Sequence, residues 1–350
     1  AFTYDGEPVT AGSLGAAGAM LALLRDALWP NLVQTAEGVP ALVHGGPFAN
    51  IAHGCNSAIA TRMALHLADW AVTEAGFGFD LGAEKFFDIK CRAAGLETHA
   101  GVLVPTVRAL KLHGGVSLAD LGKPDPAAVA RGLPNLEKHV ENIGHFGEPP
   151  VVALNRFAAD RDEEIAVVAE RCRALGVPFA VSDHFARGGE GALELAAQVR
   201  EQAARGDRPF CPLYRLEDPF PDKVLAIASR MYGARGVVLT REAERDLREV
   251  RRLGYEALPV CIAKTPASLS DDPKRRGRPR DFDVTVRSIQ IHAGAGFLVA
   301  LTGDILRMPG LPRRPLAESI DLVGEGISGL RGAPDSPPPA AESTGAAASQ

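Results

Sequence analysis

Polar, cationic and aromatic residues follow a series of short apolar runs in this chain. His44 closes the first run, Arg108 lies beyond a later one, and Arg156 and Phe157 come directly after another. Phe185 follows the next run along the chain. In an open parallel sheet, ligands bind beyond the carboxyl ends of the strands. We therefore expect a common cleft, in which cations including Lys111 and Arg187 attract an anion and the aromatic rings stack on a flat ligand.

Each of these segments also has an ordinary structural explanation. Glycines after a strand are more often tight turns than phosphate cradles. His44 is as readily a hydrogen-bonded structural imidazole as a catalytic one. The RGGEG segment at 187–191 leads into a predicted helix, whose free amides could hold a carboxylate or phosphate, or could form only a loop and a cap. The sequence leaves these alternatives open.

Short apolar runs with polar ends predict the strands that must position these residues. Helix-length segments with apolar residues at three-to-four spacing lie between them, which favours an α/β fold with a mainly parallel sheet and flanking helices. The predicted strands are 41–44, 70–73, 100–106, 150–155, 178–182 and 258–264. The predicted helical faces lie within 14–28, 51–67, 136–143, 165–172 and 193–199.

The pattern changes after Pro209. Residues 223–231 and 241–253 predict helices, and residues 284–291 and 297–301 predict two strands joined by a glycine-containing hairpin. This pattern therefore predicts a small α+β domain in the last third of the chain. Residues from about 332 onward have low complexity and predict a disordered tail.

Composition narrows the class of protein. The 350 residues are 46% hydrophobic and 23% charged, as in an ordinary folded protein, and no apolar run approaches the ~18 residues that span a bilayer. The net charge of -5 argues against a dedicated nucleic-acid binder. The five cysteines have no CxxC pair, which argues against a zinc site and favours free thiols in a reducing compartment, hence the cytoplasm.

Two nucleotide-binding motifs are absent or weak in the 350 residues. The phosphate-binding P-loop requires GxxxxGK[ST], and the one Gly-Lys pair, at Gly122, is followed by Pro124. The run from Gly76 to Gly82 is only loosely like a dinucleotide-binding loop, because its spacing is wrong and no acidic residue ends a following strand. An NAD-dependent oxidoreductase is therefore a weak alternative.

Several long segments resemble formate–tetrahydrofolate ligase, also called formyltetrahydrofolate synthetase. Residues 104–115, VPTVRALKLHGG, are similar to the VATVRALKxHGG signature of that family. The resemblance runs in the family's order over about residues 4–330. Further matching blocks are 40–92 (with HGGPFANIAHGCNS and GAEKFFDIKCR), 132–142 (GLPNLEKHVEN), 151–157 (VVALNRF), 258–279 and 293–312.

The resemblance implies a fold, an activity and partners. It implies a P-loop NTPase-like α/β fold with residues 1–110 in the nucleotide-binding domain, 111–215 in a folate-contacting domain, 216–330 in a small α+β domain and 331–350 as the tail. The implied reaction is ATP-dependent: formate gives formyl phosphate, and N10 of tetrahydrofolate then takes the formyl group. Mg²⁺, a monovalent cation such as K⁺, and a homotetramer accompany the family activity, with neither nucleic acid nor membrane as a partner.

The resemblance also assigns roles to residues. Phe157 is the implied pterin-stacking residue, with Asn155 and Arg156 beside it and Phe185, where the family has Trp, on the opposite face. A second set, Ala49, Phe77 and Gly82, falls in the adenine region. His44 falls on the family's HGGPF histidine, near the reacting phosphoryl group, whereas metal ligands are not assigned.

The sequence also departs from the family pattern. Ala158 replaces the usual Pro, Pro105 the usual Ala, and Phe79 a small residue. The family's N-terminal P-loop portion and its GGAAGGGY segment have no counterpart here, so we expect the isolated chain not to turn over. The alternatives are a split ligase, in which a separate chain carries the P-loop, and a non-catalytic remnant that binds folate or nucleotide.

Overall fold

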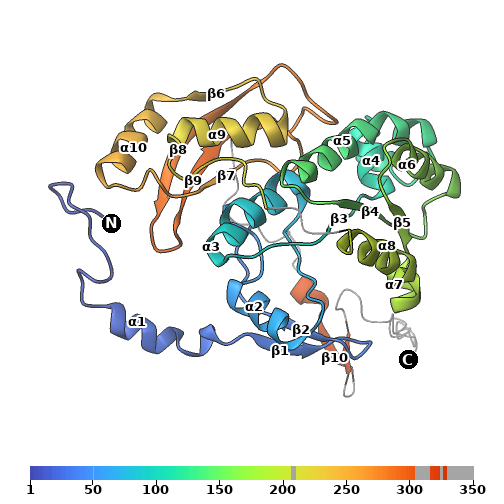
Figure 1. Ribbon diagram of the computed structural model, residues 1–350, viewed down its shortest axis with the longest axis horizontal. Helices are drawn as coiled ribbons and strands as arrows, with labels where there is room; N and C mark the ends of the chain where they lie inside the picture. Colours follow the sequence, from blue (N-terminus) through green and yellow to red (C-terminus); the bar gives the residue numbers. More distant parts are fainter. Residues whose placement is uncertain (50, 206–209, 304–315, 324–325, 329–350) are drawn as a thin grey trace, which may run out of the picture. The chain divides into compact units, whose positions relative to one another are not determined.

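The computed structural model describes residues 1–303 except 50 and 206–209, and then residues 316–323 and 326–328. The chain divides into two compact units, residues 1–305 and 306–350. The predicted tail lies outside the described residues, and the finer domain limits stay predictions. Figure 1 shows the elements along the chain. Within the described residues, no helix has both the length and the apolar character needed to cross a bilayer.

A parallel sheet of order β3-β4-β5 forms the centre of the α/β part. Its strands are β3 (Gly101–Leu103), β4 (Pro150–Asn155) and β5 (Phe179–Ser182). The α/β class with a parallel sheet is thus confirmed. The helices that follow are α4 (Val107–His113), α5 (Pro126–His145), α6 (Asp162–Ala174), α7 (His184–Arg187) and α8 (Leu193–Ala203), with η4 (Leu118–Asp120) and η5 (Gly188–Ala192) between them.

A second, mixed sheet has the order β6-β8-β9-β7. The strands are β6 (Gly236–Leu239), β7 (Val260–Ala263), β8 (Asp283–His292) and β9 (Phe297–Thr302). The predicted hairpin is confirmed, because β8 and β9 pair antiparallel from His292 and Phe297. The run at 258–264 was expected in the first sheet, but it forms β7 of this one, parallel to β9.

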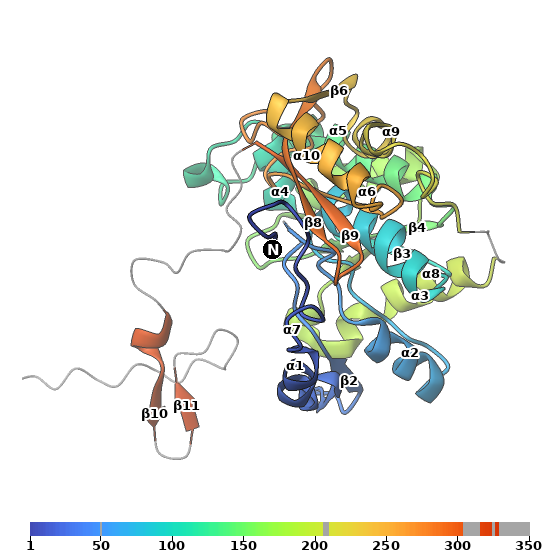
Figure 2. The same cartoon turned by 90° about the vertical axis from the view of Figure 1, so that its left-hand side faces the viewer.

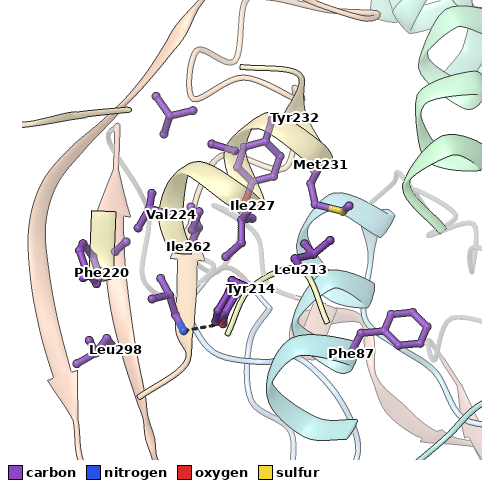
Figure 3. Close-up of a cluster of buried hydrophobic side chains, with 14 of the residues drawn as sticks. Phe87, Leu213, Tyr214, Phe220, Val224, Ile227, Met231, Tyr232, Ile262 and Leu298 are labelled. Carbon is purple, nitrogen blue, oxygen red and sulfur yellow. Dashed lines mark hydrogen bonds between the residues drawn. The ribbon is translucent and has the colours of Figure 1, made fainter. Parts of the chain in front are cut away.

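Helices α9 (Phe220–Ile227) and α10 (Arg241–Arg252) lie beside this sheet in both views (Figures 1 and 2), with η6 (Ala228–Tyr232) continuing α9. Alternate residues of the strands belong to different cores, as the two-residue period of a strand requires. Val260 and Ile262 pack with Val224 and Tyr232, whereas Cys261 packs on the other side. Figure 3 shows the first core, in which the Tyr214 hydroxyl accepts the Val260 amide hydrogen at 3.0 Å.

Helix α5 packs against the parallel sheet on one face and against η6 on another. One face packs Val129, Leu136 and Ile143 into the core beneath the parallel sheet. From another face Lys138 donates to the Arg230 carbonyl oxygen and Asn142 donates to that of Met231 at 2.9 Å. Both polar side chains are buried, so these hydrogen bonds fix how α5 and η6 pack together.

Two further predicted strands of the parallel sheet are wrong. The run at 41–44 forms β2 (Pro40–Val43), which pairs antiparallel with β1 (Asn31–Gln34) in a separate two-stranded sheet. The chain reverses there in a turn, in which the Val39 amide donates to Thr35 Oγ1 and Gly38 has a φ of 79°. Residues 70–73 form no strand, and their apolar members Trp70 and Val72 are exposed.

The N-terminal helices are shorter than the apolar spacing predicts. Helix α1 (Ala17–Leu24), followed by η1 (Asp26–Leu28), buries none of its residues. Helix α2 (Ala58–Leu67) begins only after Ser57, whose hydroxyl accepts the Ala60 amide hydrogen. In the second unit, η7 (Leu316–Ser319) precedes a hairpin of β10 (Asp321–Val323) and β11 (Gly326–Ser328).

Residues 78–95 pack as two π-helical segments, η2 (Gly78–Ala83) and η3 (Phe86–Cys91), followed by α3 (Arg92–Ala94). The sequence did not predict a helix here. Phe79, unusual for the family, joins an aromatic cluster, with its ring centroid 6.2 Å from Phe87 and 6.1 Å from Phe146. Such π-helical turns are rare and are frequently found at functional sites.

Candidate functional site

The carboxyl ends of β4 and β5 bring two exposed aromatic rings to one edge of the parallel sheet. Asn155 and Ser182 are partners in the strand register, and the Arg156 amide donates to the Ser182 carbonyl oxygen at 3.0 Å. Phe157 follows two residues after the first partner, and Phe185 three residues after the second. Their side chains are 46% and 86% exposed. Two aromatic faces are thus available to a ligand at this edge.

Hydrogen bonds fix the backbone that carries Phe157. Its amide donates to Asp160 Oδ2 at 2.9 Å, and the Asp160 amide donates back to the Phe157 carbonyl oxygen at 3.0 Å. The Asn155 amide donates to the carbonyl oxygen of Pro105 at 3.1 Å, which ties the end of β4 to the end of β3. Pro105 lies outside β3, so its missing donor costs no strand hydrogen bond.

The segment that carries Phe185 is a single closed turn. Ser182 Oγ lies 2.9 Å from His184 Nδ1, and the Asp183 amide donates to the Gly191 carbonyl oxygen at 3.0 Å. A Cβ on Gly191 would lie 2.3 Å from the Asp183 carbonyl oxygen, so only glycine fits there. The turn holds Phe185 on α7, where its side chain is exposed.

Glu37, in the turn between β1 and β2, reaches the RGGEG segment. Its carboxylate accepts the hydrogen of the Gly189 amide, one of the amides for which the sequence left open both anion binding and an ordinary loop. A Cβ on Gly188 would lie 2.3 Å from the same carboxylate oxygen. The RGGEG loop therefore binds a carboxylate, but this carboxylate is the side chain of Glu37 rather than a ligand. Sequence reasoning missed Glu37, because nothing in a polar turn indicates which distant loop it contacts.

Lys111 does not line the cleft, which corrects the expectation from sequence. It is fully buried, and its Nζ lies 2.9 Å from Glu164 Oε1 and donates to the Lys123 carbonyl oxygen. Its position on α4 directs it toward α6. Arg108 and Arg187 are exposed, and Arg156 pairs with Asp162 at 3.1 Å on the surface.

His44 holds a loop together in this structure. Its Nε2 lies 2.7 Å from the Ala27 carbonyl oxygen and its Nδ1 lies 2.7 Å from Ser57 Oγ. Since a carbonyl oxygen only accepts, Nε2 carries the hydrogen and Nδ1 accepts from the hydroxyl in the neutral ring. Both ring nitrogens are therefore used within the chain, so the catalytic role inferred for His44 stays a prediction.

The three residues of the predicted adenine region come together. A Cβ on Gly82 would lie 2.2 Å from the Ala75 carbonyl oxygen. Gly76, which follows Ala75 in the chain, lies against both Gly82 and Ala49. Phe77 projects from this small-residue cluster and is more than half exposed, whereas Ala49 and Gly82 are buried. Only Phe77 of the three presents a surface to a ligand.

A buried ionic cluster runs along the π-helical segments. Asp80 Oδ2 pairs with Lys264 Nζ at 3.0 Å, and Asp88 Oδ1 pairs with Arg92 at 2.9 Å. Glu84 is fully buried, and its oxygens have no hydrogen-bond donor among the described residues. Sequence reasoning missed this cluster, although the charged residues within the apolar run GAEKFFDIKC were its signal.

Glu84 and Asp88 are neighbouring buried carboxyl groups whose charged forms are disfavoured. Burial, and then the neighbouring Asp88 carboxylate, raise the pKa of Glu84 well above its usual value. Burial raises the pKa of Asp88 from 3.8 to about 6, although Arg92 opposes the shift. Two acidic groups with raised pKa values in the fold stabilise it at low pH, and this stability is lost as the pH rises through the folded values.

Replacing Glu84 with glutamine is therefore expected to stabilise the fold at alkaline pH. The amide of glutamine stays neutral at every pH, so the variant avoids the cost of a buried, unpaired carboxylate at position 84. We expect equal unfolding free energies near pH 4 and a gain of about 1–3 kcal/mol at pH 8, measured by urea unfolding. The exposed Glu163→Gln is the control. A Glu84→Gln difference that does not change with pH contradicts the raised pKa of Glu84.

The structure thus defines an α/β protein with aromatic and cationic groups at the ends of its parallel strands. A family model for formate–tetrahydrofolate ligase matches residues 1–331, and the chain belongs to this family. Among the described residues, no group of three or more His, Cys, Asp or Glu side chains could hold a metal ion. The cysteines are free thiols, as expected.

Proposed function

We propose that this chain acts in the ATP-dependent ligation of formate to tetrahydrofolate, giving 10-formyltetrahydrofolate through formyl phosphate. The observation that carries the proposal is the register of Asn155 with Ser182, which sets Phe157 and Phe185 at one edge. Membership of the ligase family supports the same substrates. The family activity, rather than turnover by this chain alone, is the function proposed.

In this proposal the pterin ring lies between Phe157 and Phe185. Aromatic rings prefer such stacked contacts, and both side chains are exposed and carried on hydrogen-bonded turns. Asn155 and Arg156 then provide polar groups at the ring edge. The ion pair of Arg156 with Asp162 lies on the surface, where such pairs contribute little, so the guanidinium can exchange its partner for an anionic group of the ligand.

The nucleotide part of the proposal rests on Phe77 as the stacking surface for adenine, with Ala49 and Gly82 packed behind it. A contact of His44 with a phosphoryl group requires its Nε2 to leave the Ala27 carbonyl oxygen. The Mg²⁺ and K⁺ requirement and the cytoplasmic location are part of the same proposal. Magnesium would neutralise phosphate charge while the side chains of this chain orient the substrates.

Association with further protein is also proposed, as a homo-oligomer or with a chain that supplies the P-loop. Helix α1 supports association because Leu21, Leu23 and Leu24 are all exposed on it. Contiguous exposed apolar side chains of this kind mark interaction surfaces. A non-catalytic, folate-binding or nucleotide-binding remnant remains the second candidate, favoured by Ala158 and by Phe185 in place of Trp.

The test is calorimetric titration of the purified chain with tetrahydrofolate. We expect saturable binding that Phe157→Ala and Phe185→Ala each weaken roughly tenfold to hundredfold, since stacking of a heterocycle on an aromatic ring contributes about 1–3 kcal/mol. Phe185→Trp restores the larger face and is expected to bind more tightly than the wild type. Phe2→Ala, another exposed ring, is the matched control.

The outcomes separate the two candidates. If Phe157→Ala and Phe185→Ala both lose tetrahydrofolate binding and Phe2→Ala keeps it, the result supports a folate site at the ends of β4 and β5, as proposed for the ligase. If the folded chain shows no heat of tetrahydrofolate binding, the proposed folate site is contradicted. That result favours a remnant that does not bind folate. Binding that both alanine variants retain would place the folate elsewhere in the molecule.

A further inference from the structure

A cavity of about 210 Å³ lies apart from the strand-end site, beside α2, η3 and α3. Its polar lining consists of His53, Arg62 and Lys90, and the remaining wall is formed by Ile89 and four alanines. Pockets for drug-sized ligands occupy about 300–1,000 Å³, so this one suits a small ion with water rather than a whole nucleotide. Its lining includes no carboxylate.

Lys90 brings a positive charge into this cavity without a directly paired counter-ion, since the Glu74 carboxylate acts on it only from beyond ion-pair distance. Its side chain is 4% exposed, and its Nζ donates to Thr61 Oγ1 at 2.9 Å and lies 5.2 Å from the centre of the Phe86 ring. Among the described residues, no carboxylate lies within ion-pair distance of it. A buried ammonium in this state is costly, and burial accordingly lowers the pKa of Lys90.

The neighbouring thiols do not supply the missing negative charge. Cys55 and Cys91 both lie near Lys90, and burial raises the pKa of each thiol to about 12. Both are therefore neutral at physiological pH. No side chain that lines the cavity supplies a negative charge to Lys90, and the attraction of Glu74 is the smallest of the charge effects on the pKa of Lys90.

Arg62 and His53 add hydrogen-bond donors. The Arg62 guanidinium has five N–H groups, and the structure shows one bond, from Nη2 to the Ala94 carbonyl oxygen at 2.5 Å. His53 Nδ1 is buried without a partner among the described residues, and its ring packs edge-on against Phe297. Helix α2 also begins in this wall, at Ala58, with the positive end of its dipole.

We propose that this cavity binds a small oxyanion of the phosphate class, held by Lys90, Arg62 and His53. The ion supplies the negative charge that Lys90 lacks and accepts hydrogens from the unused donors. Charge-assisted bonds from guanidinium and ammonium groups to phosphate are the strong kind. The same chemistry serves free inorganic phosphate and a terminal phosphate of a nucleotide, and it is independent of folate binding at the strand ends.

The test is titration of the whole chain with inorganic phosphate, followed by calorimetry and by thermal unfolding. We expect saturable binding and a phosphate-dependent rise in melting temperature. Lys90→Met and Arg62→Gln are each expected to weaken binding about tenfold or more, the effect of losing a charged hydrogen bond. Lys274→Met, which removes an exposed lysine, is the control and is expected to bind like the wild type.

Lys90→Met also separates a binding role from a structural one. Methionine removes a buried charge that has no ion-pair partner among the described residues, so the variant without phosphate is expected to melt at the wild-type temperature or above it. A Lys90→Met protein that melts lower with and without phosphate, or that binds phosphate as tightly as the wild type, overturns the proposal. So does a wild-type chain without saturable phosphate binding.

Competition identifies the source of the ion. If ADP displaces phosphate and binds more tightly, the cavity takes a nucleotide phosphate; if ADP does not compete, it takes the free ion. Tetrahydrofolate titration in the same variants distinguishes this proposal from the folate site, because Lys90→Met is expected to leave tetrahydrofolate affinity unchanged.

Discussion

Replacing Lys264 with methionine is expected to lower the free energy of unfolding by about 3–5 kcal/mol, the usual cost of removing one partner of a buried ion pair. Lys264 is fully buried, with its Nζ 3.0 Å from Asp80 Oδ2. It also donates to the carbonyl oxygens of Thr265 and Ser268. Burial pushes the pKa of Asp80 upward, but Lys264 holds it below its usual value. Without the lysine, a buried carboxylate is left unpaired.

A double-mutant cycle isolates this interaction. Asp80→Asn, Lys264→Met and the double variant are compared with the wild type by urea unfolding followed by circular dichroism. We expect the double variant to be less destabilised than the sum of the single variants, because it leaves no unpaired charge. Arg173→Met, at an exposed ion pair with Glu170, is the control and is expected to have almost no effect. Additive effects at Asp80 and Lys264 would contradict a coupled pair.

Gly132→Ala is expected to destabilise the fold by about 3 kcal/mol, at the upper end of the usual cost of overpacking. Gly132 lies within α5, where alanine normally stabilises a helix. Here, however, a Cβ would lie 2.0 Å from the Leu110 carbonyl oxygen of α4. Gly114 makes the reciprocal contact, since its Cβ would lie 2.0 Å from the Ala128 carbonyl oxygen. Both clashes involve backbone, which cannot move aside as a side chain would.

The matched control lies in the same helix. Gly144 has open space around its Cβ position, so Gly144→Ala is expected to stabilise the fold by about 0.5–1 kcal/mol. Opposite signs for two identical substitutions in α5 would locate the effect in the contact with α4. Thermal and urea unfolding measure both. If Gly132→Ala were neutral or stabilising, the close approach of α4 and α5 would be contradicted.

The sequence predicts those parts of the fold that depend on local pattern. The parallel strands β4 and β5 and the β8–β9 hairpin lie where apolar runs end in polar or glycine-rich residues. The short strands β1 and β6 were missed, because short apolar runs do not by themselves distinguish a strand from other structure. Residues 41–44 were assigned to the wrong sheet, since a strand's pattern does not identify its partner.

The same limit applies to the candidate site. Phe157 and Phe185 were found because residues that follow adjacent parallel strands must share an edge. The burial of Lys111 against Glu164 and the contact of Glu37 with Gly189 join residues far apart in the chain, so no local spacing indicates them. Resemblance to the ligase family identified His44 and Phe77 as candidates, but only the structure shows what else their atoms contact.

Helix α5 has contacts on two faces at once, and this restricts the changes in length that it can tolerate. Each added or deleted residue rotates the following part of an α-helix by about 100°. An insertion that moved Ile143 out of the core would also move Asn142 away from the Met231 carbonyl oxygen. Natural variation in length is therefore expected in the loops before Pro126 and after His145, while the helix itself varies only by substitution.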